Sequence, residues 1–70
     1  MNKAQLDYIR RMYPPGQRIR VDAMPQDPDP VPPGTLGTAA YVDDAGQIGV
    51  AWDNGRSLAL IPGVDSFGRA

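Results

Sequence analysis

The first apolar positions of the chain repeat with the period of an α-helix. Leu6, Ile9 and Tyr13 are spaced so that they share one face of such a helix. Asn2 is a suitable N-cap, and a glutamine lies three residues after it, as in a capping box. The proline pair after Tyr13 ends the pattern, because the residue before a proline disfavours the α conformation. We therefore expect a short helix over residues 2–13. Its apolar stripe should pack on the same domain, and docking onto a partner is the alternative.

From residue 17 onward, apolar positions alternate with polar ones, which is the pattern of half-buried β-strands. In the first such segment Ile19, Val21 and Ala23 share one face, and charged residues occupy the other. Strands are predicted over residues 17–23, 36–43, 47–53 and 56–61, with a short last strand around Phe67. Sequences rich in Gly, Pro and Asp separate these segments, as expected for turns.

The apolar pattern also decides the register of the hairpin around Asn54-Gly55. A two-residue loop would divide the large apolar side chains between both faces of the hairpin. A three-residue loop, from Asp53 to Gly55, collects them on one face. The resulting pairs are Trp52 with Arg56, Val50 with Leu58 and Ile48 with Leu60. Gly55 should then have a positive φ. Asp53 and Asn54 are interpreted as turn formers, and Arg56 is expected to cover the exposed edge of Trp52.

Residues 24–34 form a proline-rich segment, with prolines at positions 25, 28, 30, 32 and 33. This density excludes a strand or a helix and predicts a stiff loop that ends in a type II turn at Pro33-Gly34. Because a pre-ordered loop loses little entropy on binding, we expect it to contact a partner. The residues expected at this contact are Asp27, Asp29 and Val31 in the loop, with Arg18, Arg20 and Tyr41 beside it. The alternative is that the loop only covers one end of the fold.

One long first connection followed by short strands and tight turns is typical of small barrels. We predict a mainly β fold, a small SH3-like barrel of four to five antiparallel strands with a short N-terminal α-helix. Residues 1–70 should form a single domain, with the helix in residues 2–13 and the barrel in residues 17–69. A small OB-like barrel is the alternative architecture.

The composition narrows the possible chemistry. The chain has no Cys, His or Glu, and its eight acidic and seven basic side chains give a net charge of -1. Zinc sites of Cys and His and His-dependent nucleophiles are therefore excluded. The carboxylate pairs, Asp27 with Asp29 and Asp43 with Asp44, lack the spacing of an EF-hand. We expect no catalytic residue, no cofactor and no metal. The apolar runs are also too short for a signal peptide or a membrane span, which favours the cytoplasm.

Two segments carry a resemblance to a known family. They are "YPPGQRIRVDAM" and "DPDPVPPGTLGTAAYVDDAGQIGVAWDNGRSLALIPGVDSF", which cover about residues 12–67. Together they resemble the domain of unknown function 4314 family, which is common in phage, plasmid and other mobile-element genes. The resemblance implies a mobile-element origin and a small β-barrel, and it carries no settled activity. Ala39 and Ala40 depart from the bulkier β-branched residues expected at these positions.

The residues and the resemblance together predict a non-enzymatic interaction module in the cytoplasm of a bacterial host. A protein partner is expected, and small size and origin suggest a phage accessory or anti-defence (anti-CRISPR-like) inhibitor. The alternative is a small nucleic-acid-binding barrel that uses Arg18, Arg20 and Tyr41, because small barrels bind single strands with aromatic and basic side chains. The excess of aspartate argues against that alternative. No membrane binding is expected, and the pattern leaves the oligomeric state open.

Overall fold

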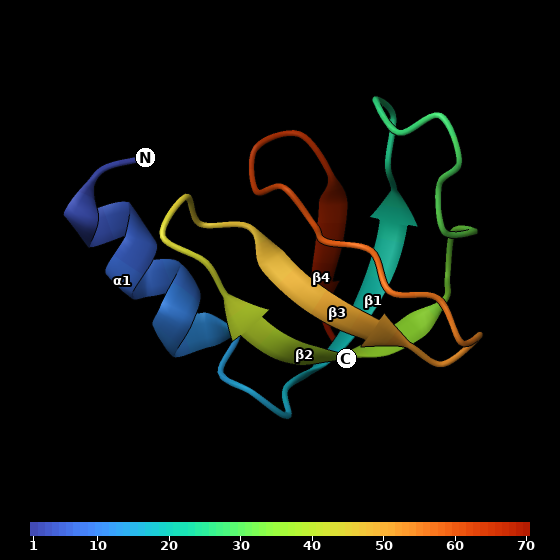
Figure 1. The fold of residues 1–70 in the computed structure, drawn as a ribbon, viewed down its shortest axis with the longest axis horizontal. Helices are drawn as coiled ribbons and strands as arrows, with labels where there is room; N and C mark the ends of the chain where they lie inside the picture. Colours follow the sequence, from blue (N-terminus) through green and yellow to red (C-terminus); the bar gives the residue numbers. More distant parts are fainter.

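The protein consists of one short helix followed by a four-stranded antiparallel sheet (Figure 1). The computed structural model describes all 70 residues. The elements are α1 (Lys3–Met12), β1 (Arg18–Ala23), β2 (Leu36–Val42), β3 (Ile48–Trp52) and β4 (Ser66–Arg69). The sheet order is β3-β2-β1-β4, so the last strand returns to lie beside the first. The predicted mainly β fold with an N-terminal helix is confirmed, including the short last strand around Phe67.

The sheet is open and does not complete the ring of a barrel. β3 and β4 form its two edges, and no ladder joins them. The strand predicted over residues 56–61 is not continuous, because only Ser57 and Leu60 pair with β3, as isolated bridges. The interruption has a local cause: the Leu58 carbonyl accepts a hydrogen bond from the indole N–H of Trp52 at 3.0 Å, rather than one from the β3 backbone. The SH3-like barrel form therefore stays a prediction.

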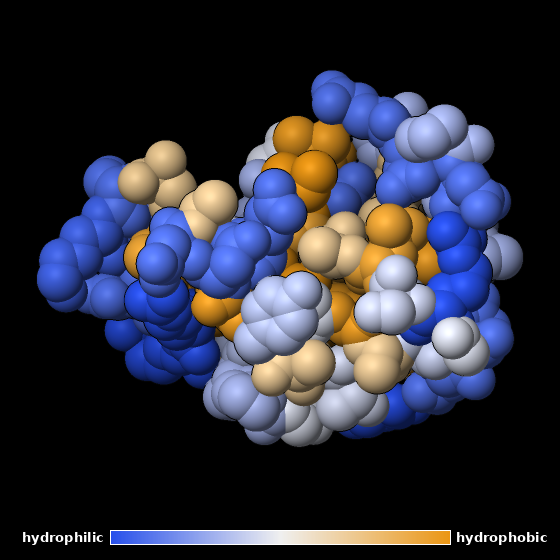
Figure 2. Space-filling model, viewed as in Figure 1, coloured by the Kyte–Doolittle hydropathy of each residue, from blue (hydrophilic) through white to orange (hydrophobic).

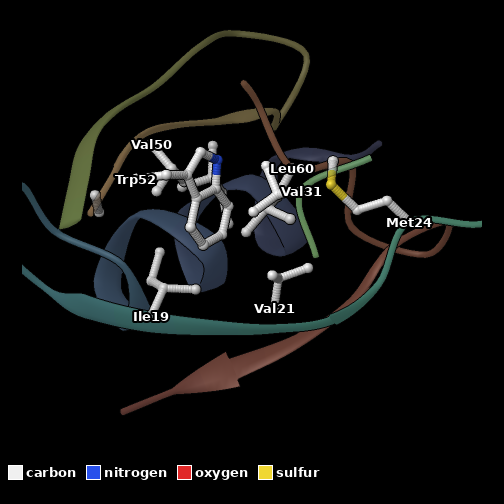
Figure 3. Close-up of a cluster of buried hydrophobic side chains, with 9 residues drawn as sticks. Ile19, Val21, Met24, Val31, Val50, Trp52 and Leu60 are labelled. Atoms are coloured by element: carbon white, nitrogen blue, oxygen red, sulfur yellow. The ribbon is translucent and has the colours of Figure 1, made fainter. Parts of the chain in front are cut away.

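One apolar cluster fills the inner side of the sheet (Figure 3). Its nine buried members are Ile19, Val21, Met24, Val31, Ala39, Ile48, Val50, Trp52 and Leu60. The inward positions predicted for β3 are confirmed, and Trp52 is only 3% exposed. No polar side chain is buried. Stability therefore depends on apolar burial, which in a chain this short is small in total.

The prediction that Ala23 continues the inner face of β1 is wrong. Ala23 is exposed, and the next residue, Met24, occupies the buried position. The register between β1 and β4 shifts between Val21 and Ala23. A bulge of this kind adds one residue on one strand and so reverses the direction of the side chains that follow. The alternation in the sequence does not reveal it, because the bulge depends on pairing with a distant strand.

The hairpin after β3 has the predicted three-residue loop. Ile48 and Leu60 exchange two backbone hydrogen bonds, each 2.9 Å long, and the Trp52 N–H donates to the Arg56 carbonyl at 2.9 Å. Gly55 has a φ of +90°, in the region that side chains with a β-carbon rarely adopt. The register that gathers the large apolar side chains on one face is therefore confirmed.

The helix begins where the sequence predicts. It contacts the rest of the fold through its C-terminal half. Asn2 and Gln5 form the complete capping box, with N···O distances of 2.9 and 3.0 Å. Ile9 and Tyr13 pack against the core, and the Tyr13 ring meets Phe67 edge-on at 5.5 Å between ring centroids. No residue of α1 is fully buried. With ten residues, this one helix is too short to reach across a bilayer.

Candidate functional site

The six residues predicted to contact a partner do not form one surface. Strand alternation places Arg18 and Arg20 on the outer face of the sheet, away from the core. Tyr41 reaches the same face because the register of β2 against β3 shifts between Ala39 and Tyr41. Asp27 belongs to the proline-rich loop, where it lies beside the segment that leads to β4, and Asp29 follows it in the same loop. The predicted adjacency of β1 and β2 is confirmed, but it does not bring the loop carboxylates onto the outer face.

Val31 is a core residue, so its prediction as a partner contact is wrong. Its side chain is 1% exposed and lies in the cluster with Val21, Met24 and Leu60 (Figure 3). Full burial of a valine side chain contributes about 1.5–3 kcal/mol, which explains why Val31 turns inward. In this respect the loop covers the core, which is the alternative that the sequence left open.

Arg56 fastens the proline-rich loop to the hairpin turn. Its guanidinium donates to the carbonyl oxygens of Asp29 at 2.6 Å and Pro30 at 3.1 Å. The Asp29 carboxylate also lies 3.5 Å from the guanidinium. Carbonyls in a loop of prolines lack strand partners, and the several donors of one guanidinium can satisfy two of them. The sequence did not indicate this role of Arg56, and its predicted cover of the Trp52 edge stays a prediction.

The two arginines of the outer sheet face are both paired with carboxylates. Arg18 binds Asp53 through two hydrogen bonds, of 2.9 and 2.5 Å, and donates a third to the Thr38 hydroxyl at 2.9 Å. The hydrogen bonding of the Asp53 carboxylate to Arg18, together with the positive charge of Arg18, lowers the pKa of Asp53 below its ordinary value of 3.8. Arg20 lies 3.2 Å from the Asp22 carboxylate. The positive charge of this face is thus largely neutralised within the protein.

Tyr41 is the exposed aromatic residue of the outer face. It is 58% exposed, and its ring lies over Gly49, its pairing partner in β3. A side chain at position 49 would collide with the ring, so the glycine sets where Tyr41 lies. On its other side the ring borders a shallow groove of about 330 Å³ toward α1. Tyr13 also lines that groove, and burial raises the pKa of its hydroxyl above 10.0.

A larger groove lies between the N-terminal half of α1 and the turn before β4. Its volume is about 440 Å³. The apolar lining comes from Met1, Ala4 and Ile9, with the Tyr8 ring, and the opposite wall is formed by Pro62 and its neighbouring glycine. Hydrophobic residues flank the notch that separates the helix from the body of the molecule (Figure 2). We call this feature the α1 groove.

The charges of α1 leave one arginine free beside the α1 groove. Lys3 pairs with Asp7 at 2.8 Å, and the pKa of Asp7 is lowered by that hydrogen bond and charge. Arg10 pairs with Asp44 at 2.9 Å. Arg11 has no carboxylate partner, and its guanidinium stacks 5.6 Å from the centre of the Tyr8 ring. The edge of the groove is therefore both aromatic and positively charged.

Sequence reasoning missed the α1 groove because it followed only one stripe of the helix. Leu6, Ile9 and Tyr13 form the predicted stripe, and Ile9 and Tyr13 pack against the core. Met1, Ala4 and Tyr8 have the same i, i+3, i+7 spacing and form a second apolar stripe. This second pattern is the sequence signal from which the groove could have been predicted. An apolar stripe on both sides of a short helix indicates that one of them is left uncovered.

The fold and its grooves define a small, mainly β domain with a partly covered helix and no converging metal-ligand side chains. The chain belongs to the family described as Domain of unknown function (DUF4314), whose profile matches residues 2–70. The resemblance found in the sequence is thereby confirmed. Searches among curated proteins and among solved structures gave no significant match.

Proposed function

We propose that this protein is a non-enzymatic interaction module whose α1 groove binds a protein partner. The occupant is a segment that inserts an apolar side chain between α1 and the turn at Pro62 and places a carboxylate at Arg11. The single observation that carries the proposal is the open apolar groove, with Met1 59% and Tyr8 49% exposed on its rim.

Apolar contact area and a free charge support this choice of surface. Large apolar side chains that line a concave site gain free energy when a partner removes them from water. Tyr and Arg are the residue types that most often contribute strongly to interface affinity. Tyr8 and Arg11 are already stacked, so both side chains lose little conformational freedom on binding. A carboxylate is the complementary charge for Arg11.

The more specific version of the proposal is an accessory or anti-defence protein of a mobile element that blocks a host complex. Its support is the mobile-element origin that the family resemblance implies. The nucleic-acid alternative would use the outer sheet face, where Tyr41 is exposed. Pairing of Arg18 with Asp53 and of Arg20 with Asp22 argues against it, because phosphate binding requires free positive charge.

Site-specific photo-crosslinking in lysate of the bacterial host tests the proposal. A benzophenone amino acid is placed at Tyr8 in one variant and at Tyr41 in another, and crosslinked proteins are identified by mass spectrometry. We expect a defined protein adduct from position 8 and none from position 41. Adducts from position 41 alone would contradict the α1 groove as the binding site.

A matched pair of tyrosine variants provides the control. Tyr8→Ser and Tyr41→Ser remove the same exposed ring from the two surfaces. The adducted protein, once purified, should bind the Tyr41→Ser variant with unchanged affinity and the Tyr8→Ser variant at least tenfold more weakly. Retention of the native protein on a single-stranded DNA column at low salt, lost in the Tyr41→Ser variant, would instead favour the nucleic-acid alternative.

A further inference from the structure

The outer edge of β4 presents backbone groups that the chain does not pair. β4 is an edge strand whose one ladder is with β1. The Ala70 N–H donates to the Arg18 carbonyl at 3.0 Å. This bond determines which residues of β4 direct their backbone groups toward β1 and which direct them away from it. Gly68, two residues before Ala70, therefore directs its N–H and C=O toward β1. Phe67 and Arg69 direct theirs away from the sheet, so two donors and two acceptors lie on the free edge.

We propose that two copies of the protein associate through this edge, with their β4 strands antiparallel and a two-fold axis at Gly68. In this register Phe67 of each copy lies opposite Arg69 of the other. Both residues direct their backbone groups outward, so the two pairs form four hydrogen bonds and satisfy every free group on the edge. The two sheets then form one continuous sheet across the axis. This association is separate from the α1 groove.

The glycine at position 68 independently supports the close approach of a second β4 backbone. Its φ is not positive, and a β-carbon added there would meet no atom of the same chain within 4 Å. Neither backbone conformation nor internal packing therefore requires a glycine at this position. A glycine inside a strand often marks a place where another backbone comes close. In the proposed register the two Gly68 residues form the narrow, non-hydrogen-bonded pair of the ladder, where the strands are closest.

Several features that usually prevent edge pairing are missing from β4. The strand contains no lysine, no proline and no bulge of its own. The guanidinium of its one charged residue, Arg69, is directed back to the Gln17 side chain at 3.1 Å. The net charge of -1 gives little repulsion between copies. The other edge of the sheet, at β3, is occupied by the bridges to Ser57 and Leu60, so β4 is the edge open to pairing.

Sedimentation velocity over a wide concentration range tests the proposal on the whole chain. The contact is short, so we expect a weak dimer that appears only as concentration rises. Arg69→Pro removes an outward N–H without removing a bond to β1, and proline is tolerated at such edge positions. By symmetry it removes two of the four hydrogen bonds, so dimerisation should weaken by about 10–30-fold, at roughly 1 kcal/mol per bond. Arg69→Ala keeps the N–H and should still dimerise.

Amide hydrogen exchange identifies the edge directly and separates loss of pairing from loss of folding. The N–H groups of Phe67 and Arg69 should become protected as concentration rises, whereas the N–H of Gly68 should be protected at every concentration. The Arg69→Pro variant should keep the protection of Gly68. A monomer at the highest accessible concentration overturns the proposal. So does a dimer in which the amides of Phe67 and Arg69 exchange freely.

Discussion

Gly55 is the residue on which the corner after β3 depends, because the three-residue loop needs a left-handed backbone at its last position. A residue with a β-carbon is strained there. Gly55→Val should therefore lower the free energy of unfolding by about 1–3 kcal/mol. The measurement is a urea titration of the variant beside the native protein. Equal stability of the Gly55→Val variant and the native protein would contradict the assigned turn.

The ion pair between Arg18 and Asp53 predicts a dependence of stability on pH. Folding lowers the pKa of Asp53, so the unfolded chain binds a proton more readily than the folded one. The contribution of the pair is therefore present above the ordinary pKa of 3.8 and is lost as pH falls through the lower folded value. Asp53→Asn should reduce stability slightly at pH 7 and have a smaller effect in strong acid. Both side chains are solvent-exposed, so the difference at pH 7 should also shrink in high salt.

The proline-rich loop combines a buried anchor, Val31, with an exposed acidic surface. Val31→Ala removes apolar contacts from the core and should cost about 2 kcal/mol of stability. Asp27→Asn combined with Asp29→Asn changes the charge of the same loop and leaves the backbone contacts of Arg56 intact, so its melting curve should stay close to that of the native protein. Thermal melts of both variants make the comparison. A neutral Val31→Ala variant would mean that the loop does not cover the core in solution.

The elements could be predicted from the sequence wherever local pattern and turn chemistry agree. The capping box at Asn2 and the positive φ of Gly55 follow from short stretches that carry their own physical reason. Val31 and Arg56 could not be placed in this way. Their positions depend on which segment lies across the core from the loop, and that is decided by the return of residues 56–65 rather than by neighbours in the chain.

The protein has a single apolar core, and Trp52 lies in it. The indole packs inside the cluster and holds the Leu58 carbonyl, so it joins the sheet to the segment that covers it. Trp52→Ala should cost about 3–5 kcal/mol. Small domains have total stabilities of about 5–15 kcal/mol, with short chains at the low end, so the variant should be largely unfolded. Circular dichroism provides the measurement. A folded variant with normal stability would contradict the central position of this side chain.

The candidate site was less predictable than the fold because it arises between elements. Tyr8 and Met1 are visible in the sequence as a second helical stripe, but only the angle of α1 to the sheet leaves that stripe uncovered. Arg18 and Arg20 show the opposite case. Their exposure on β1 was predictable from alternation, but their ion pairs were not. The pair of Arg18 with Asp53 depends on the turn after β3 lying beside β1 in space, and the pair of Arg20 with Asp22 depends on the side-chain conformations of both residues.

The pairing of β4 with β1 has a consequence for synthesis on the ribosome. Ile19 and Arg69 are partners in the sheet although fifty positions of sequence separate them. While the intervening chain is made, the nascent β1 has one side without its neighbour, and the apolar face of Ile19 and Val21 lacks the cover that Phe67 later adds. The sheet is complete only after Arg69 has left the exit tunnel. Because its contacts are mostly distant in sequence, this domain should fold after translation of the segment and more slowly than a helical protein of the same length.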